Sequence, residues 1–228
     1  MEDFRAGDGR VPVRIAAESE VALTSGVPLT LVGKLWRAAR FAAAHAGTTG
    51  RLALAICNDE GALGLLRHGR PSKFVNLLSE ADRSERVPPS EIRVSEQGVL
   101  QAIWSLEMRS GEPLHAELLH VLARWLPEAV VLVEADRAEY ESRLRGRERG
   151  RSHFDRLGDE RLPEAIERGM RGMRAILELW ALHVPDADRL DFWNGGDARA
   201  RDIAEWIDAL SAVRSVESGS LRESGSLR

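Results

Sequence analysis

The stretch Val130-Val131-Leu132-Val133 decides the fold that this sequence predicts. A continuous run of β-branched residues and leucine is typical of a strand that is buried on both faces, as the strands of parallel sheets are. The arginine-rich segment 137–151 follows the run and is expected to be helical. A buried strand that leads directly into a helix is the repeating unit of an α/β protein.

Short apolar stretches alternate with helical periodicity on both sides of this strand. Strands are expected at 91–95 and around 190–192, and helices over 99–108, 114–126, 164–183 and 203–210. This order predicts an α/β fold with a three-layer parallel sheet flanked by helices.

The beginning of the chain gives less distinct patterns. Residues 1–28 are read as a loop or a pair of weak strands, with apolar runs at 11–17 and 21–23. Residues 28–45 have the apolar spacing of a helix. Residues 51–68 fit either a strand up to Cys57 or a helix interrupted at Gly61, and periodicity does not separate the two. A further short helix is expected around 74–78.

The length and the composition favour one globular domain. The 228 residues, 43% of them hydrophobic, suffice for one substantial core, which is expected to occupy residues 1–214. The hexapeptide Glu-Ser-Gly-Ser-Leu-Arg occurs at 217–222 and again at 223–228. A repeat this short cannot bury apolar surface, so residues 215–228 are expected to be a disordered tail.

The charge and the cysteine content exclude several classes of function. The formal net charge is -4, which gives no general reason to expect binding to nucleic acid or to an anionic membrane. The single cysteine, Cys57, excludes an internal disulfide and a cysteine-based zinc site. The six histidines show no spacing typical of metal ligands, and no metal site is expected. No window approaches roughly 18 uninterrupted apolar residues, so a cytoplasmic protein is predicted.

The turn Ser95-Glu96-Gln97-Gly98 is the first candidate for chemistry. Ligands of open parallel sheets bind beyond the carboxyl ends of the strands, where an acid can take a proton or order the waters of a magnesium ion. Glu96 would be that acid. From the residues alone, the favoured interpretation is that Glu96 and Gln97 cap and solvate a turn between strand and helix.

The arginines that follow the decisive strand are the second candidate, and they lie at Arg143, Arg145, Arg147, Arg149 and Arg151. Guanidinium groups neutralise the charge that develops on phosphoryl oxygens, so the segment could act as a lid over phosphates. Glu139, Glu141 and Glu148 lie at spacings that allow pairs within the helix, and charge runs usually form solvated faces.

Two further positions are open to more than one interpretation. Asp136 ends the decisive strand, where an aspartate is more often the N-cap of the next helix than a ligand contact. The turn at Gly195-Gly196-Asp197 would let the backbone approach a planar ring, but Gly-Gly before a helix is also a common connector.

Taken in order, the Glu96-Gln97-Gly98 turn, the segment 101–104, the strand 130–136 and the arginine segment resemble thymidylate-kinase-like P-loop kinases over residues 90–212. The resemblance implies an ATP- and Mg²⁺-dependent phosphotransferase that acts on a nucleotide or another small acceptor. It implies Glu96 as the acid beside the acceptor. It implies a charge-stabilising lid of Arg147, Arg149 and Arg151, and it assigns Arg143, Gly196 and Asp197 to nucleotide binding.

The sequence departs from this group at the phosphate loop. Such a loop reads GxxxxGK followed by Ser or Thr, so that backbone amides, the lysine and the hydroxyl hold the phosphates and magnesium. The nearest segment runs from Gly26 to Gly33-Lys34-Leu35, with six residues between the glycines and a leucine in place of the hydroxyl. A P-loop fold incomplete at the N-terminus is therefore expected, with ATP and Mg²⁺ binding in doubt and little or no catalysis.

Two explanations and one rival function follow from this departure. Either the natural protein extends upstream of Met1, or the chain is a degenerate relative in which residues 11–15 or 21–24 refill the sheet. The rival is a non-catalytic regulatory protein whose arginine-rich helix binds an acidic partner or, less expected, a nucleic-acid backbone.

Overall fold

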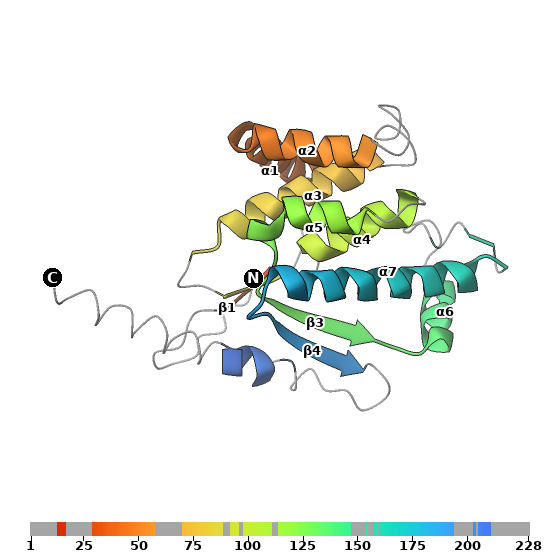
Figure 1. Cartoon of the computed structure of the whole chain (residues 1–228). Coiled ribbons are helices and arrows are strands. Elements are labelled where there is room, and N and C mark those ends of the chain that lie inside the picture. The colour runs from red at the N-terminus through yellow and green to blue at the C-terminus, as the bar shows by residue number, and fades with distance from the viewer. Residues whose placement is uncertain are drawn as a thin grey trace.

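The computed structural model describes residues 13–16, 29–57, 70–88, 92–95, 98–110, 114–146, 154, 157–158, 160–193, 203 and 205–210. Within these ranges the backbone forms two pairs of short parallel strands and is otherwise mainly helical (Figure 1). No helix among them is both long and apolar enough to cross a membrane.

The first layer is built by three helices, α1 (Leu29–Ala44), α2 (Ala46–Cys57) and α3 (Arg70–Glu85). The helix α2 answers the question that the sequence left open, because the chain up to Cys57 is helical and not a strand. Its residues Leu52, Ala55 and Ile56 are buried at the spacing of one helical face. The contacts of α1 are mainly with α3, which in turn packs against the next helix, α4.

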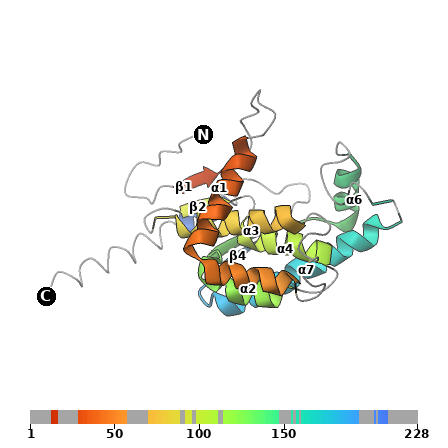
Figure 2. The same cartoon turned by 90° about the horizontal axis from the view of Figure 1, so that it is seen from above.

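The apolar face of α1 is divided between core and surface. Ala38 and Phe41, in its second half, are buried in the core. Its first half leaves Leu31, Val32, Leu35 and Trp36 exposed, and Trp36 reaches 66% exposure. Figure 2 shows this first half projecting beyond the helices beneath it. Helical periodicity predicted the helix correctly, but it did not predict which apolar side chains are covered.

The second layer contains α4 (Val99–Ser110), α5 (His115–Val121), the short 3-10 helix η1 (Ala123–Trp125) and α7 (Leu162–His183). The helices α4 and α7 approach closely at Gly169, where an added Cβ would lie 3.1 Å from the Trp104 ring. The Trp104 Nε1 donates a hydrogen bond of 2.7 Å to the Gly169 carbonyl. A larger residue at position 169 would therefore push the two helices apart.

The strands form two separate parallel pairs. β1 (Val13–Ala16) pairs with β2 (Ile92–Ser95), and β3 (Ala129–Glu134) pairs with β4 (Asp188–Trp193). In the registers, Val13 lies beside Ile92 and Ala129 beside Asp188. The helices α6 (Arg137–Gly146) and α7 connect β3 to β4.

The expected three-layer parallel sheet is wrong. The elements at 91–95, 130–133 and 190–192 are strands as predicted, but no strand in the described ranges joins β2 to β3. The physical reason is that most of the core is made between helices, with α3 against α4 and α4 against α7, and the strand pairs attach to this helical body. A P-loop-type sheet is therefore not what these residues form.

The largest buried side chains predict where the fold is most sensitive. Leu118 is completely buried in α5, so Leu118→Ala removes packing and leaves a cavity, at a cost of about 2–5 kcal/mol in unfolding free energy. Leu182 of α7 is 76% exposed, and Leu182→Ala should change stability by less than about 0.5 kcal/mol. Urea denaturation of both variants measures the difference, and equal losses would contradict this assignment of the core.

Candidate functional site

One pocket of about 520 Å³ lies between the two strand pairs. Its wall contains residues 93–95 of β2, residues 98–101 at the start of α4, residues 124–128 before β3 and residues 129–132 of β3. The end of α3, two side chains of α7 and the helical residues Trp206, Ile207 and Leu210 complete the wall. This volume is within the usual range of small-molecule sites.

The first turn of α4 lies at the pocket wall. The Ala102 amide donates to the Gly98 carbonyl over 3.1 Å, which makes Gly98 the residue that precedes the helix. The next amides, of residues 99–101, are those that a helix leaves without partners inside itself. Because residues 98–101 line the pocket, the positive end of the helix dipole lies at its wall.

Two of the arginines that line the pocket, Arg83 and Arg124, are paired with acids. Arg83 lies 3.3 Å from Glu80, its neighbour one turn away on α3. Arg124 donates to Glu85 over 3.1 Å and stacks on the Trp125 ring at 4.6 Å from the ring centre. The indole Nε1 of Trp125 is buried and has no hydrogen-bond acceptor in the described part of the chain. The guanidinium groups of Arg83 and Arg124 at the pocket are therefore neutralised by neighbouring acids.

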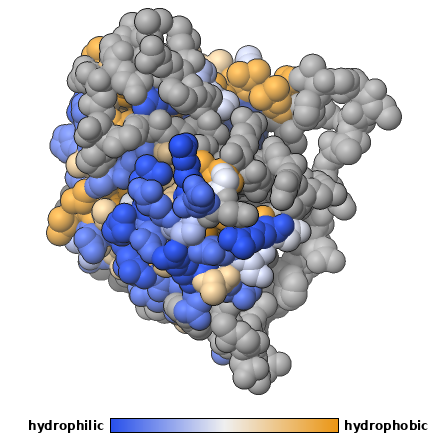
Figure 3. Space-filling model, turned by 90° about the vertical axis from the view of Figure 1, so that its right-hand side faces the viewer, coloured by the Kyte–Doolittle hydropathy of each residue, from blue (hydrophilic) through white to orange (hydrophobic). Residues whose placement is uncertain are grey.

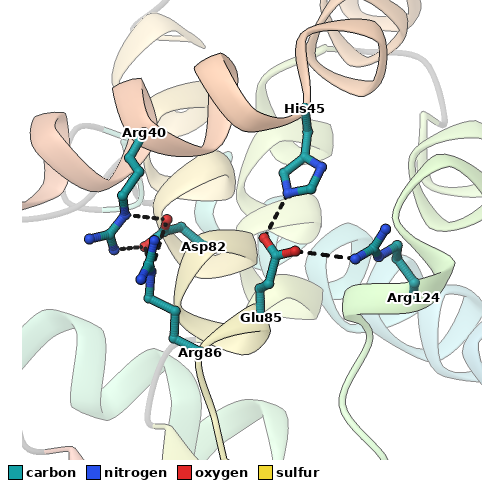
Figure 4. Close-up of polar contacts among 6 residues, drawn as sticks. All are labelled: Arg40, His45, Asp82, Glu85, Arg86 and Arg124. Carbon is teal, nitrogen blue, oxygen red and sulfur yellow. Dashed lines mark hydrogen bonds and ion pairs between the residues drawn. The ribbon is translucent and has the colours of Figure 1, made fainter.

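A network of ion pairs on α3 fixes the helices behind the pocket (Figure 4). Asp82, whose side chain is only 3% exposed, accepts hydrogen bonds from Arg40 of α1 and lies 3.4 Å from Arg86. Glu85, one turn further along, is held between His45, at 2.7 Å, and Arg124. Figure 4 shows these two carboxylates leaving α3 toward different partners, so α1, α3 and η1 are tied together.

The pKa of the Asp82 carboxyl is lowered by this arrangement. Burial alone would raise its pKa, but the hydrogen bond and the charge of Arg40, together with Arg86, more than offset burial. A carboxyl with a depressed pKa stabilises the fold above its unfolded value of about 3.9. That stabilisation is lost as the pH falls through the folded pKa.

Most of the residues predicted from the sequence lie outside the described ranges. Glu96, Arg147, Arg149, Arg151, Gly196 and Asp197 all do, so their proposed roles stay predictions. Arg143 is described, and its Nε donates to Glu139 over 2.7 Å on the surface of α6. The Tyr140 amide donates to the Asp136 carbonyl, which supports the interpretation of Asp136 as the residue that precedes α6.

The described arginines of α6 form a self-neutralised face. Arg137 pairs with Glu141 and with Glu167 of α7, and Arg145 lies 3.8 Å from Glu141. Figure 3 shows the end of the molecule that carries α6, where hydrophilic residues form one continuous surface. Figures 1 and 2 place α6 at the opposite end of the molecule from β2. The arginines up to Gly146 are therefore not gathered at the pocket.

The described residues contain no phosphate loop of the kind that would hold the expected ATP and Mg²⁺. Gly33 and Lys34 lie within α1, whose helical backbone cannot wrap a phosphate. No cluster of three or more His, Cys, Asp or Glu side chains suited to a metal occurs where side chains are described. The described residues therefore do not include a phosphate loop of the P-loop type, and binding of ATP and Mg²⁺ stays a prediction.

Sequence reasoning missed several parts of this site. The sequence indicated no site role for Arg124, because its partner Glu85 lies 39 residues away in the chain. Gly98 had been singled out, and its place before a helix was the one local signal for the pocket. Trp206 was expected in a last helix, but nothing local indicated that it faces β3.

Comparison with protein families, with curated proteins and with solved structures gave no match for this chain.

The Asp82 network predicts a pH-dependent loss of stability. Asp82→Asn should lower the unfolding free energy at pH 7, because the charged hydrogen bonds with Arg40 and Arg86 are lost. The difference between the native protein and the variant should begin to shrink as the pH falls below about 4, where the carboxyl of the unfolded chain becomes protonated, and should disappear below the lower pKa of the folded carboxyl. Urea denaturation at several pH values measures it.

Asp191→Asn is the matched control for this prediction. The Asp191 side chain is 54% exposed, and its ion pair in the described part of the chain is with Arg189 two residues away, so its loss should change stability little. A difference between native protein and Asp82→Asn that stays constant from pH 7 to pH 3 would contradict the charged role of Asp82.

Proposed function

We propose that this protein is related to ATP-dependent phosphotransferases and binds the phosphate end of a nucleotide without transferring it. The observation that carries the proposal is the first turn of α4, which follows β2 and opens into the pocket. Helix N-termini bind phosphate through free backbone amides and the helix dipole. The pocket volume of about 520 Å³ and the presence of Trp206 in its wall suit a ligand with a planar ring.

The absence of transfer follows from the sequence. No GxxxxGK[ST] segment occurs in the 228 residues, so the lysine and hydroxyl that orient the terminal phosphates in P-loop kinases are missing. Glu96 remains the proposed acid next to this turn, and Arg147, Arg149 and Arg151 the proposed lid. Without oriented phosphates, these groups have no transition state to stabilise.

Nucleotide binding is tested by thermal denaturation with ATP. At a tenfold excess over its Kd, ATP should stabilise the protein by about 1.4 kcal/mol, or about 3–6 °C in Tm. DNA and RNA should give little shift. A regulatory protein that binds a nucleic-acid backbone would show the reverse, with a response that falls steeply as salt is added.

The site of binding is tested by two substitutions at Gly98, where an added Cβ would meet no atom within 4 Å. Asp and Asn are both better residues than Gly before a helix, so Gly98→Asp and Gly98→Asn should each stabilise the free protein by a few tenths of a kcal/mol. Gly98→Asp should abolish most of the ATP-dependent shift, because its carboxylate repels phosphate. Gly98→Asn is equal in shape and caps the same amides without a charge, so it should weaken the shift less than Gly98→Asp does, and equal shifts in both variants would place the ligand elsewhere.

Transfer is tested by Glu96→Ala. Since no turnover is expected from this chain, phosphate release from ATP should be at background in both the native protein and the variant. Turnover in the native protein that Glu96→Ala removes would show that catalysis proceeds without the missing loop. Turnover that survives Glu96→Ala would also refute the role of this acid.

A further inference from the structure

The walls of the pocket follow the edges of two strands. Ala129, Val130, Val131 and Leu132 are consecutive residues of β3, and all four line the pocket. Side chains of consecutive strand residues point to opposite faces of a sheet, so a space that meets all of them cannot lie over one face. It must run along the strand edge. The consecutive residues 93–95 of β2 border the same space.

One edge of each strand is already occupied. β3 is paired with β4, and no residue of β4 whose side chain is described lines the pocket. β2 is paired with β1 along its whole length. The pocket therefore borders the second edges of β2 and β3, where the described part of the chain records no strand pairing. Edges of this kind are templates for another strand.

Helices cover the pocket from both sides. Met173 and Leu177 of α7 contribute to one side, and Trp206, Ile207 and Leu210 contribute to the other. Figure 1 shows α7 above the β3–β4 pair and the helix that carries Trp206 below it. A strand in this position would be buried on both faces, and such strands are continuous runs of Val, Ile and Leu.

We propose that the pocket between β2 and β3 accepts an extended apolar segment of another polypeptide, which pairs with both strands as an added strand. A compact ligand would fill the apolar space, but it could not supply the alternating donors and acceptors that two strand edges require. The added strand and the nucleotide of the proposed function would occupy the same pocket, so peptide binding is measured without ATP and the ATP-dependent Tm shift without peptide.

Binding is tested with a synthetic peptide whose core is Val-Ile-Val-Ile-Val, flanked by Gly-Lys at both ends. We expect saturable binding, followed by the fluorescence of Trp125 and Trp206, which line the pocket. Hydrogen exchange should show new protection at the amides of β2 and β3 that point away from β1 and β4. If these amides are already fully protected without peptide, a segment of the same chain occupies the edge, and the proposal is overturned.

Backbone pairing is tested with two N-methylated versions of the peptide. Methyl groups on the second and fourth core residues block pairing with one neighbouring strand, and those on the third and fifth block pairing with the other. Both versions should bind at least tenfold more weakly than the parent peptide. If one version or both bind as well as the parent, the segment is not inserted between two strands.

A pair of protein variants locates the binding site on β3. Val131 lines the pocket, whereas Val133 points to the same face of the strand, is 44% exposed and does not line it. Val131→Lys should abolish binding and Val133→Lys should preserve it. If Val131→Lys fails to fold, the N-methylated peptides and the exchange data still test the proposal.

The two proposals can fail separately. An ATP-dependent Tm shift without peptide binding would refute this inference alone, and peptide binding without that shift would refute only nucleotide binding.

Discussion

The packing of α3 between α1 and α4 is the constraint on which the remaining structure depends. α3 buries Leu77, Leu78 and Ala81 and also the carboxylate of Asp82. A buried carboxylate is tolerated only where cations reach it, so Arg40 of α1 fixes how the first helix lies on α3. The end of α3 then forms part of the pocket wall, which means that this ion pair and the pocket share one supporting helix.

The two strand pairs are attached to the helical body at different places. Trp180 of α7 donates a hydrogen bond of 2.8 Å to the Pro127 carbonyl, immediately before β3, and so holds the β3–β4 pair beneath α7. β2 is connected to the same body through Gly98 and α4. Nothing in the described residues bridges the space between these two attachments, so strand edges and the start of a helix meet at one pocket. The pocket therefore combines an apolar interior, which the strands provide, with a polar helix turn at the start of α4.

The arginine-rich segment shows how the number of charged residues can mislead. In α6 the arginines at 137, 143 and 145 each have a glutamate partner, on the same helix or on α7. A guanidinium that is already hydrogen-bonded must exchange that partner before it can bind a phosphate, which reduces the net gain. The sequence allowed two interpretations, a lid over phosphates and a solvated charged face, because the glutamates lie at helical spacing from the arginines. The spacing favoured the solvated face that the described half adopts.

Local patterns in the sequence determined the elements. The apolar run at 130–133 predicted β3, the spacing within 164–183 predicted α7, and Pro127 marked the boundary between η1 and β3, because each signal depends on neighbours a few residues away. The prediction failed where the structure depends on contacts between segments that are far apart in the chain. Only the tertiary structure decided that β2 pairs with β1, that Trp36 stays exposed and that residues from α3, α4, β3 and the last helix share one pocket. Strand pairing and side-chain burial are set by contacts between segments far apart in the chain, and no local periodicity records them.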